Sequence, residues 1–339
     1  MSDDIALLGV PATRTTFPTL PVLPEAVTFC ARVQARSLPF SLARSASCPC
    51  CFPPALGLFL DLLRCPTCHT RRLHPDRGAL CCPTGHTFDI ARHGYASLLT
   101  GTRATSGDDV AMVQARDRFL ATGRYAPILQ AVTRLAADAV PERGTVVDVG
   151  CGTGHYLAGV LDHLHGARGL GLDTSVRALR SAARAHERAA AATWDVFRPF
   201  PLADEVADVV LDVFAPRNPT EFHRVLRPAG RLIVVRPTDR HLVELRGRVP
   251  AMVTIDPAKE QRLHRALDPY FTVTVTEQVE YPMALVGLEV LDLVGMTPSA
   301  RHVNRADLSD DGLLPDQVTV SVLATAYQLR RPRVGACAC

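Results

Sequence analysis

The chain has 339 residues, of which 47% are hydrophobic and 21% are charged, as in a folded protein with one large domain and smaller attachments. No run reaches the roughly 20 apolar residues of a membrane-spanning helix, and residues 1–4 lack the basic region of a secretory signal. The formal net charge of +3 is too small to indicate a nucleic-acid-binding protein by itself. These values argue against a membrane or secreted protein, and we expect a cytoplasmic one.

The basic residues and the cysteines are both unevenly used. Lys259 is the only lysine, so arginine accounts for the other 36 of 37 basic residues. A GC-rich genome explains this bias more simply than selection for phosphate contacts, which arginine also suits. Eleven cysteines occur in uneven clusters, and Cys151 lies in a glycine-rich stretch. This distribution favours a cytosolic protein with a metal site over a disulfide-stabilised scaffold.

Residues 1–56 show little hydrophobic periodicity. They carry scattered prolines and a loop-like cluster at residues 45–54, and they predict a poorly ordered N-terminal extension. Cys48, Cys50 and Cys51 fall in this segment, but their spacing is wrong for a compact metal site.

Two cysteine-containing turns follow, at residues 65–68 and 81–86. Each contains proline or glycine and presents two ligands, as a structural zinc ribbon requires for tetrahedral coordination. The expected ligands of one closed, structural zinc ion are Cys65, Cys68, Cys82 and His86. Cys81 is the nearest alternative to Cys82, although the pair Cys82-Pro83 repeats the earlier Cys65-Pro66. His69 and His74 are weaker alternatives.

The zinc-binding ribbon is expected over residues 57–100, with a strand and turn at 87–99 completing it. Between residues 64 and 103 there are six arginines and four histidines against two acids. A small basic module beside a larger domain suggests RNA recognition, although an ordinary solvated surface has the same composition.

Two helices are predicted after a polar linker at residues 101–109. The first covers 110–120 and stops at Thr122-Gly123, and the second starts at Tyr125-Ala-Pro127 and runs toward residue 139. Tyr125 is therefore placed either to cover a bound cofactor or to pack in the core.

A buried strand at residues 145–149, with Asp148 in it, leads into Gly150-Cys-Gly152-Thr153-Gly154 and then a helix to residue 164. Strand, glycine turn and helix begin a nucleotide-cofactor crossover unit, because glycine lets the backbone turn sharply and approach a ligand. A dinucleotide loop would have its third glycine one residue later, where His155 stands. The DxGxGxG pattern instead resembles the S-adenosylmethionine (SAM) loop of class I methyltransferases.

The following segments continue this pattern. The strand at 169–173 ends at Asp173, whose carboxylate is placed to accept both ribose hydroxyls and would disfavour a 2′-phosphate. An Ala- and Arg-rich helix is predicted over 175–191, followed by Asp195, where class I enzymes often present an acid to the adenine amino group. The strand at 207–214 contains Asp212 and leads into the loop where the catalytic face begins.

The rest of the chain completes the sheet. A helix at 219–226, a turn at 227–230 and a strand at 231–235 lead to a loop with Asp239 and His241 at the carboxyl end of that strand, where ligands bind in open α/β sheets. Alternating strands at 271–276 and 317–323 predict an edge pair, and 283–295 is expected to be helical. Residues 101–330 are thus expected to form an α/β domain with a Rossmann-like, mostly parallel seven-stranded sheet, and 331–339 a frayed tail.

The motifs in combination carry a family resemblance. They include Cys65-Pro-x-Cys68, Cys82-Pro-x-x-His86, Gln114-Ala-Arg116, Gly123-x-Tyr125-x-Pro127, Asp148-x-Gly-Cys-Gly-x-Gly154, Ala215-Pro216, Pro228-x-Gly230, Arg240-His241-Leu242 and Met296-Thr-Pro298. In this order, over about residues 57–330, the chain resembles the bacterial 23S rRNA guanine-N1-methyltransferases. It is most similar to the actinomycete branch that protects producers of tylosin- and mycinamicin-like macrolides.

The resemblance implies a homodimer that uses SAM and one structural zinc ion and modifies the hairpin 35 loop of 23S rRNA, at guanine 748 in that branch. It implies SAM contacts from Tyr125, the Gly152-Thr153 turn and His241. The relatives carry small polar residues near Trp194-Asp195, so a role of Asp195 at the adenine rests on the generic fold alone. The main alternative is a SAM-dependent methyltransferase of a small natural product, and another is a non-catalytic rRNA-binding protein.

The sequence does not identify a general base. Guanine N1 carries a proton that must leave before methylation, so a proton acceptor is needed near the methyl donor. Asp212 and Asp239 are candidates, and water is the alternative.

Overall fold

The computed structural model of this chain describes residues 52–101, 108–249, 251–252, 258–286, 288–303 and 314–330. Nearly all of the predicted N-terminal extension and the tail from residue 331 lie outside the described residues. The helix α1 (Pro54–Gly57) begins just inside that predicted extension, and its Leu56 is fully buried.

A small antiparallel sheet follows α1. Its strands, in the order β1-β2-β3, are β1 (His74–Asp76), β2 (Ala79–Cys81) and β3 (Thr87–Asp89). Strands of three residues are too short to be stable alone. Their buried residues Leu80 and Phe88, which face each other in register, belong to the same apolar cluster as Val147 of the large sheet. The small sheet is therefore part of a continuous core.

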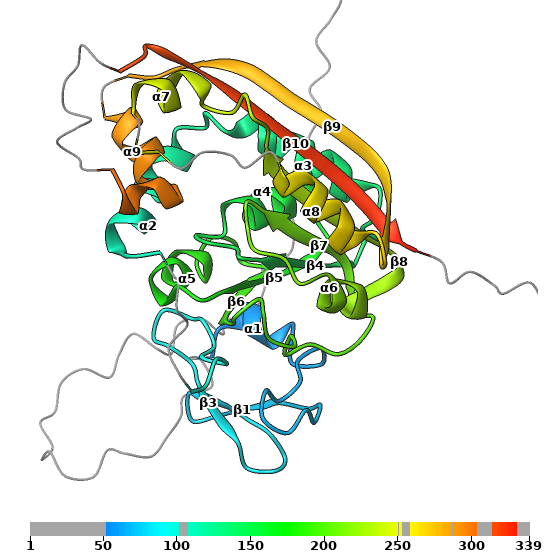
Figure 1. Cartoon of the computed structure of the whole chain (residues 1–339). Helices are drawn as coiled ribbons and strands as arrows, with labels where there is room; N and C mark the ends of the chain where they lie inside the picture. The colour runs from blue at the N-terminus through cyan, green and yellow to red at the C-terminus, as the bar shows by residue number, and fades with distance from the viewer. Residues whose placement is uncertain are drawn as a thin grey trace, which may run out of the picture. The chain divides into compact units, whose positions relative to one another are not determined.

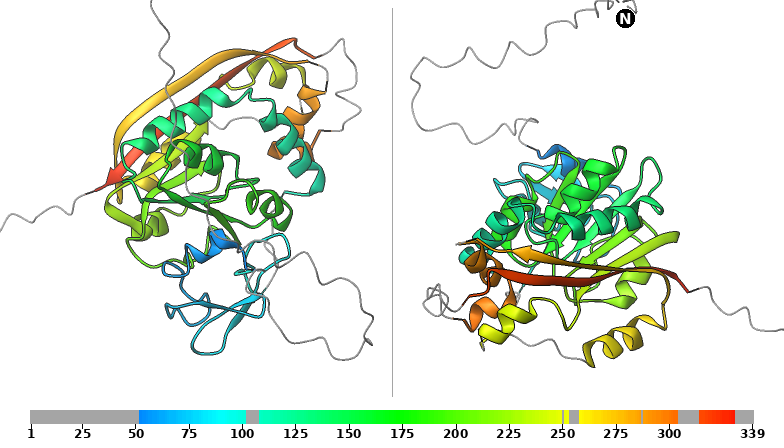
Figure 2. Two further views of the ribbon diagram at one scale, coloured as in Figure 1. Left: turned by 180° about the vertical axis from the view of Figure 1, so that it is seen from behind. Right: turned by 90° about the horizontal axis from the view of Figure 1, so that it is seen from above.

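The large sheet has seven strands in the order β6-β5-β4-β7-β8-β10-β9 (Figure 1). Its strands are β4 (Thr145–Val149), β5 (Arg168–Asp173), β6 (Ala189–Thr193), β7 (Ala207–Val213), β8 (Leu226–Pro237), β9 (Phe271–Ala284) and β10 (Gln317–Leu329). Strands β4 to β8 are parallel neighbours, whereas β10 pairs antiparallel with both β8 and β9. Figure 2 shows this last pair side by side along one edge. The predicted mostly parallel sheet and its edge pair are confirmed.

Helices cover the sheet. They are α2 (Val110–Ala121), α3 (Ala126–Ala137), α4 (His155–His163), α5 (Val176–Ala182), α6 (Pro219–Val225), α7 (Val243–Arg248), α8 (Ala258–Leu267) and α9 (Glu289–Gly295), with a 3₁₀ turn η2 (Pro298–Arg301). The neighbouring residues Val146 and Val147 belong to different apolar clusters, so β4 is buried on both faces, as a parallel strand requires. Among the described helices, none is long and apolar enough to cross a membrane.

The helix predicted over 175–191 is wrong in its second half. The helix α5 ends at Ala182, and residues 189–193 (Ala-Ala-Ala-Ala-Thr) form the strand β6, all of it buried. Alanine has the highest helix propensity, but its advantage is only a fraction of a kcal/mol per residue. Burial and backbone pairing override it here, because small side chains fit where β6 is covered on both faces.

Two other predicted boundaries differ. The predicted turn at 227–230 is a bulge inside β8, since Leu226 pairs with Ala207 and Arg231 pairs with Val209. The strand β9 continues to Ala284, so the helix expected from residue 283 begins only at Glu289.

Candidate zinc site and cofactor cavity

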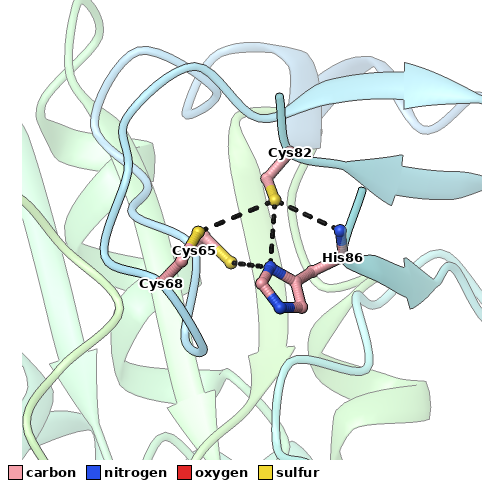
Figure 3. Close-up of side chains that lie close together, drawn as sticks. All are labelled: Cys65, Cys68, Cys82 and His86. Carbon is pink, nitrogen blue, oxygen red and sulfur yellow. Dashed lines mark hydrogen bonds between the residues drawn. The ribbon is translucent and has the colours of Figure 1, made fainter. Parts of the chain in front are cut away.

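The four predicted metal ligands converge. The ligand atoms of Cys65, Cys68, Cys82 and His86 all lie within 4.8 Å of one another. The sulfurs of Cys68 and Cys82 are 3.8 Å apart, and Nδ1 of His86 lies 3.3 Å from Cys82 Sγ and 3.7 Å from Cys65 Sγ (Figure 3). A tetrahedron with zinc–sulfur bonds of about 2.3 Å and a zinc–nitrogen bond of about 2.0 Å has edges of about 3.8 Å and 3.5 Å. The donor set therefore fits zinc in size and in chemistry.

Cys81 is not part of this group. It ends β2, and neighbouring residues of a strand point to opposite sides, so the side chains of Cys81 and Cys82 diverge. Hydroxyls of Thr70 and Thr84, 3.1 and 3.0 Å from Cys68 Sγ, lower the pKa of that thiol to about 5. Burial raises the pKa of Cys82, but hydrogen bonds with Thr84 and His86 outweigh it and bring the value to about 7. Both thiols are therefore readily deprotonated for metal binding.

A cavity of about 650 Å³ opens at the carboxyl ends of β4, β7 and β8. Five of the predicted cofactor residues line it: Tyr125, Gly150, Gly152, Thr153 and His241. The lining also includes residues of α2, the start of α4, and η2. The family resemblance includes motifs from α2 and next to η2, but the sequence did not place these segments at the cofactor site.

The backbone conformation of the glycine turn suits the close approach of a cofactor. Gly150 and Gly152 have φ of 74° and 54°, which side chains other than glycine rarely adopt. A Cβ at Gly150 would lie 2.6 Å from the Cβ of Ala215, and one at Gly152 would lie 3.2 Å from the guanidinium of Arg116. The turn thus has no side chain at Gly150 or Gly152, so its backbone can come close to a ligand in the cavity, as in a loop that holds a nucleotide cofactor.

Asp173 supports this turn directly. One carboxylate oxygen accepts a hydrogen bond from the backbone N–H of Gly152 at 2.8 Å, and the other accepts one from that of Ser175 at 2.7 Å. Burial raises the pKa of Asp173, and these two bonds oppose the rise. Asp173 itself lies outside the residues that line the cavity, so its contact with a ribose stays a prediction.

Tyr125 and His241 form a pair in the cavity wall. Tyr125 caps the start of α3, and its hydroxyl is 3.5 Å from Nε2 of His241. The other ring nitrogen, Nδ1, accepts the backbone N–H of Ser321 at 3.2 Å. Burial, with a contribution from Arg246, lowers the pKa of His241 to about 4. The ring is therefore neutral near pH 7, and its proton sits on Nε2, so His241 is a hydrogen-bond donor toward the cavity and not a base.

Phe214 is a cavity residue that the sequence analysis did not single out. It follows β7 directly, its φ is 57°, and 42% of its surface is exposed. Its ring stacks against His241 with centroids 6.3 Å apart and planes 27° apart. A bulky residue in the left-handed region is uncommon, and such outliers concentrate at functional sites.

Arginines contribute most of the charge around the cavity. Arg116 pairs with Asp108 and donates to the carbonyl of Met296 at 2.9 Å, so it closes over the glycine turn. The Nε of Arg217 lies 3.3 Å from the carboxylate of Asp212, a fully buried residue. Arg116 is part of the motif Gln114-Ala-Arg116, but the sequence assigned neither arginine a role at the cofactor site.

The remaining predicted residues are not among those that line the cavity. Gly154 is the N-cap of α4, and Asp212 is buried under Arg217. Asp239 is exposed, and its carbonyl accepts a hydrogen bond from Arg246. Asp195 accepts the backbone N–H of Phe197 at 3.0 Å. Their proposed roles at the cofactor or as proton acceptor stay predictions.

Two protein families match parts of this chain. The family described as "RlmA, N-terminal", a zinc ribbon, matches residues 63–103, and the family described as "Methyltransferase domain" matches residues 146–231. The first match contains the four zinc ligands, and the second contains the glycine turn and the central strands. Fold and sites together define a class I SAM-dependent methyltransferase that carries a structural zinc ribbon.

Curated relatives narrow this class. The chain is 46% identical over 293 residues to a putative 23S rRNA (guanine-N1)-methyltransferase of Micromonospora griseorubida, covering 81% of this chain and 98% of the relative. It is 41% identical over 252 residues to the 23S rRNA (guanine(748)-N1)-methyltransferase of Streptomyces fradiae, covering 73% of this chain and 88% of the relative. A putative enzyme of the same name from Bacillus subtilis is 34% identical over 195 residues, covering 55% and 68%. The chain belongs to the 23S rRNA (guanine-N1)-methyltransferase family.

Proposed function

We propose that this enzyme methylates N1 of guanine 748, in the hairpin 35 loop of 23S rRNA, and so confers resistance to mycinamicin- and tylosin-type macrolides. The observation that carries the proposal is the 41% identity, over 88% of its length, to the Streptomyces fradiae relative named for guanine 748. The alternative, methylation of a small natural product, leaves the zinc ribbon without a role in substrate binding. A ribosomal substrate places the enzyme in the cytoplasm.

The cofactor is held by the residues around the glycine turn. Tyr125, the Gly150–Gly154 turn and His241 contact it, Asp173 accepts the ribose hydroxyls, and Asp195 accepts the adenine amino group. Bound SAM supplies an electrophilic methyl group. His241, neutral with its proton on Nε2, donates a hydrogen bond and cannot remove a proton from the substrate.

The target guanine is flipped out of the RNA and stacks on Phe214, whose half-exposed ring lies at the cavity beside His241. Arg217, held by buried Asp212, presents its guanidinium to the same cavity. A positive charge there favours the deprotonated, anionic form of the base, which is the nucleophile. This anion forms when the N1 proton leaves to water or to Asp239. An unchanged pH profile of single-turnover methylation in Asp239→Asn would exclude that residue.

The zinc ribbon, residues 57–100, is proposed to be the RNA-recognition module, and residues 101–330 the catalytic domain. We also propose a homodimer, which would offer the RNA two ribbons. Sedimentation velocity of the full chain tests this, and a monomer at micromolar concentration would contradict it.

The function is tested with purified enzyme, SAM and a 23S rRNA fragment that contains hairpin 35. N1-methylation removes the Watson–Crick donor of guanine, so we expect reverse transcription to stop one nucleotide before position 748. A fragment with adenine at that position is the control, and isotope-labelled SAM with the macrolide alone tests the alternative. Label in the macrolide with unmodified RNA would refute the proposal. Expression in a susceptible host should raise resistance to tylosin together with the modification.

A further inference from the structure

A cluster of cationic side chains lies where the zinc ribbon meets the catalytic domain. The ribbon turn at residues 91–95 packs on the end of α5, and a Cβ built on Gly94 would lie 3.6 Å from that of Ala183. In this turn, Nε2 of His93 is 3.2 Å from Nε of Arg92. Its Nδ1 is 3.1 Å from a guanidinium nitrogen of Arg184, just after α5. Two parts of the chain, about 90 residues apart in sequence, thus bring like charges together.

The helix extends this cluster into a row. Arg177 and Arg180 are three residues apart on one face of α5, and Arg184 follows four residues later, in the turn just after the helix, where continued helical geometry would keep it within about 60° of them. At a rise of about 1.5 Å per residue the row spans about 10 Å along the helix axis. Arg177 and Arg184 are exposed, and Arg180 is half-buried. The row is therefore open to a large ligand.

The arginines of this cluster differ from neighbouring arginines in their lack of acidic partners among the described residues. At the same junction, Arg64 pairs with Asp204 and Arg168 pairs with Asp61. Within the described residues, no ion pair is found for Arg92, Arg177, Arg180 or Arg184, and the buried Nε of Arg180 makes no hydrogen bond. Asp117, a carboxylate that reaches α5, accepts a hydrogen bond from Ser181 and is not ion-paired with these arginines among the described residues.

A structural explanation accounts for only part of this charge. The carboxyl end of a helix carries about half a negative charge, which stabilises one nearby cation. Here three arginines surround one histidine, and partial burial together with these arginines lowers the pKa of His93. Holding like charges this close is unfavourable for the free protein, so the cluster suits a ligand that supplies negative charge.

We propose that Arg92, Arg180 and Arg184, with His93, form a phosphodiester-binding site that guides substrate RNA from the ribbon to the catalytic cavity. The start of α5 adjoins the cavity, because Ser175 donates a hydrogen bond to the carbonyl of Asp108, which lines it. An open row of spaced arginines fits successive backbone phosphates better than one enclosed anion. The inference rests on the proposed function, since the RNA is its substrate.

The test compares R180Q/R184Q and R92Q with the wild type. The control R134Q removes an exposed arginine of α3 that is paired with Glu277. RNA affinity is measured with the hairpin 35 fragment over a range of salt, SAM affinity by calorimetry, and zinc by metal analysis. For the double variant we expect affinity for RNA to fall roughly tenfold or more at 0.1 M salt, and the slope of log affinity against log salt to fall by about 0.7–0.9 per lost contact. SAM affinity, zinc content and the control should be unchanged.

Two further measurements keep the outcomes distinct. In the R180Q background, Arg184→Lys (R180Q/R184K) should bind RNA more tightly than R180Q/R184Q does, because lysine keeps the positive charge that glutamine removes. RNA affinity and salt slope equal to the wild type in R180Q/R184Q would overturn the site while leaving the proposed function intact. The site would also be overturned if R180Q/R184Q lost binding of inorganic phosphate but kept wild-type RNA affinity, because this result would indicate a site for a free anion. A wild-type enzyme that neither binds nor methylates the RNA would overturn both.

Discussion

Replacing Phe214 by glycine separates stability from activity at the cavity. The left-handed backbone at Phe214 (φ 57°) costs a residue other than glycine about 1–2 kcal/mol, which the variant recovers. Glycine loses about 0.5–1 kcal/mol through the entropy of its unfolded chain. The ring is 42% exposed, so its loss removes about half of the 1.5–3 kcal/mol of a fully buried side chain. These terms nearly cancel, and the free energy of unfolding should change by about 1 kcal/mol or less.

The same change should strongly impair methylation. Stacking of a base on an aromatic side chain contributes about 1–3 kcal/mol, so kcat/KM for the RNA should fall about 5- to 160-fold. Single-turnover methylation of the hairpin transcript measures this loss, and urea denaturation of the same preparation measures stability. Phe214→Tyr keeps both the ring and the strained backbone, and it should keep both the activity and the stability.

Either half of this prediction can fail. Wild-type kcat/KM in Phe214→Gly would show that the ring is no platform for the base. A loss of more than about 3 kcal/mol of stability would show that the ring is a core residue whose packing exceeds any backbone strain. SAM affinity, measured by calorimetry, should stay within a few-fold of the wild type, since the substitution leaves the glycine turn unchanged.

Three further predictions concern the metal and two buried groups. Cys65→Ser should lose the zinc ion and RNA methylation, whereas Cys81→Ser, whose side chain lies off the site, should keep one zinc by metal analysis. The pKa of His241 is lowered to about 4, below its unfolded value of about 6.5. Burial of the neutral ring therefore contributes fully to stability above pH 6.5, and this contribution is lost as the pH falls toward 4. Urea denaturation at pH 5 and 7 should show that the stability of His241→Gln relative to the wild type is higher at pH 5 than at pH 7. Burial, with the charge of Asp173, raises the pKa of Asp148 to about 8. The wild type should thus lose stability between about pH 4 and 8, and the melting-temperature advantage of Asp148→Asn should grow over that range; a pH-independent difference would contradict it.

The sequence predicted the sites whose chemistry is local. Zinc ligands come in pairs on short turns, so spacing indicated Cys65, Cys68 and His86, and the repeated Cys-Pro pair favoured Cys82 over Cys81. Strand, glycine turn and helix are likewise consecutive, and the cavity formed around Gly150 and Gly152 as expected.

Features that depend on distant contacts were not predictable in this way. The left-handed backbone of Phe214 is imposed by its surroundings, and no residue type signals it in advance. The pairing of Arg92 and Arg184 around His93 joins two segments that only the folded chain brings together. Asp212 was a candidate proton acceptor by its place at the strand end, but the sequence did not indicate its ion pair with Arg217.

The alanine strand β6 shows why the ribbon and the catalytic domain are best regarded as one structural unit. The ribbon residue Ala96 donates its N–H to the carbonyl of Ala191 and accepts the N–H of Thr193, both at 2.9 Å. It thereby covers the outer edge of β6, which would otherwise expose unpaired backbone groups. The hydroxyl of Thr193 also accepts the N–H of Leu99 at 3.0 Å.

A run of alanines has too little apolar surface to hold an edge strand in place by side-chain packing alone. The ribbon therefore adds backbone hydrogen bonds to the outer edge of β6. Zinc, by ordering the ribbon, therefore supports the catalytic sheet as well as the surface proposed to hold RNA. Because Asp195 follows β6 by two residues, loss of the metal should also disturb this residue, which we propose to contact the adenine. A metal without an open coordination position can thus contribute to a methyl-transferring enzyme through the structure that it stabilises.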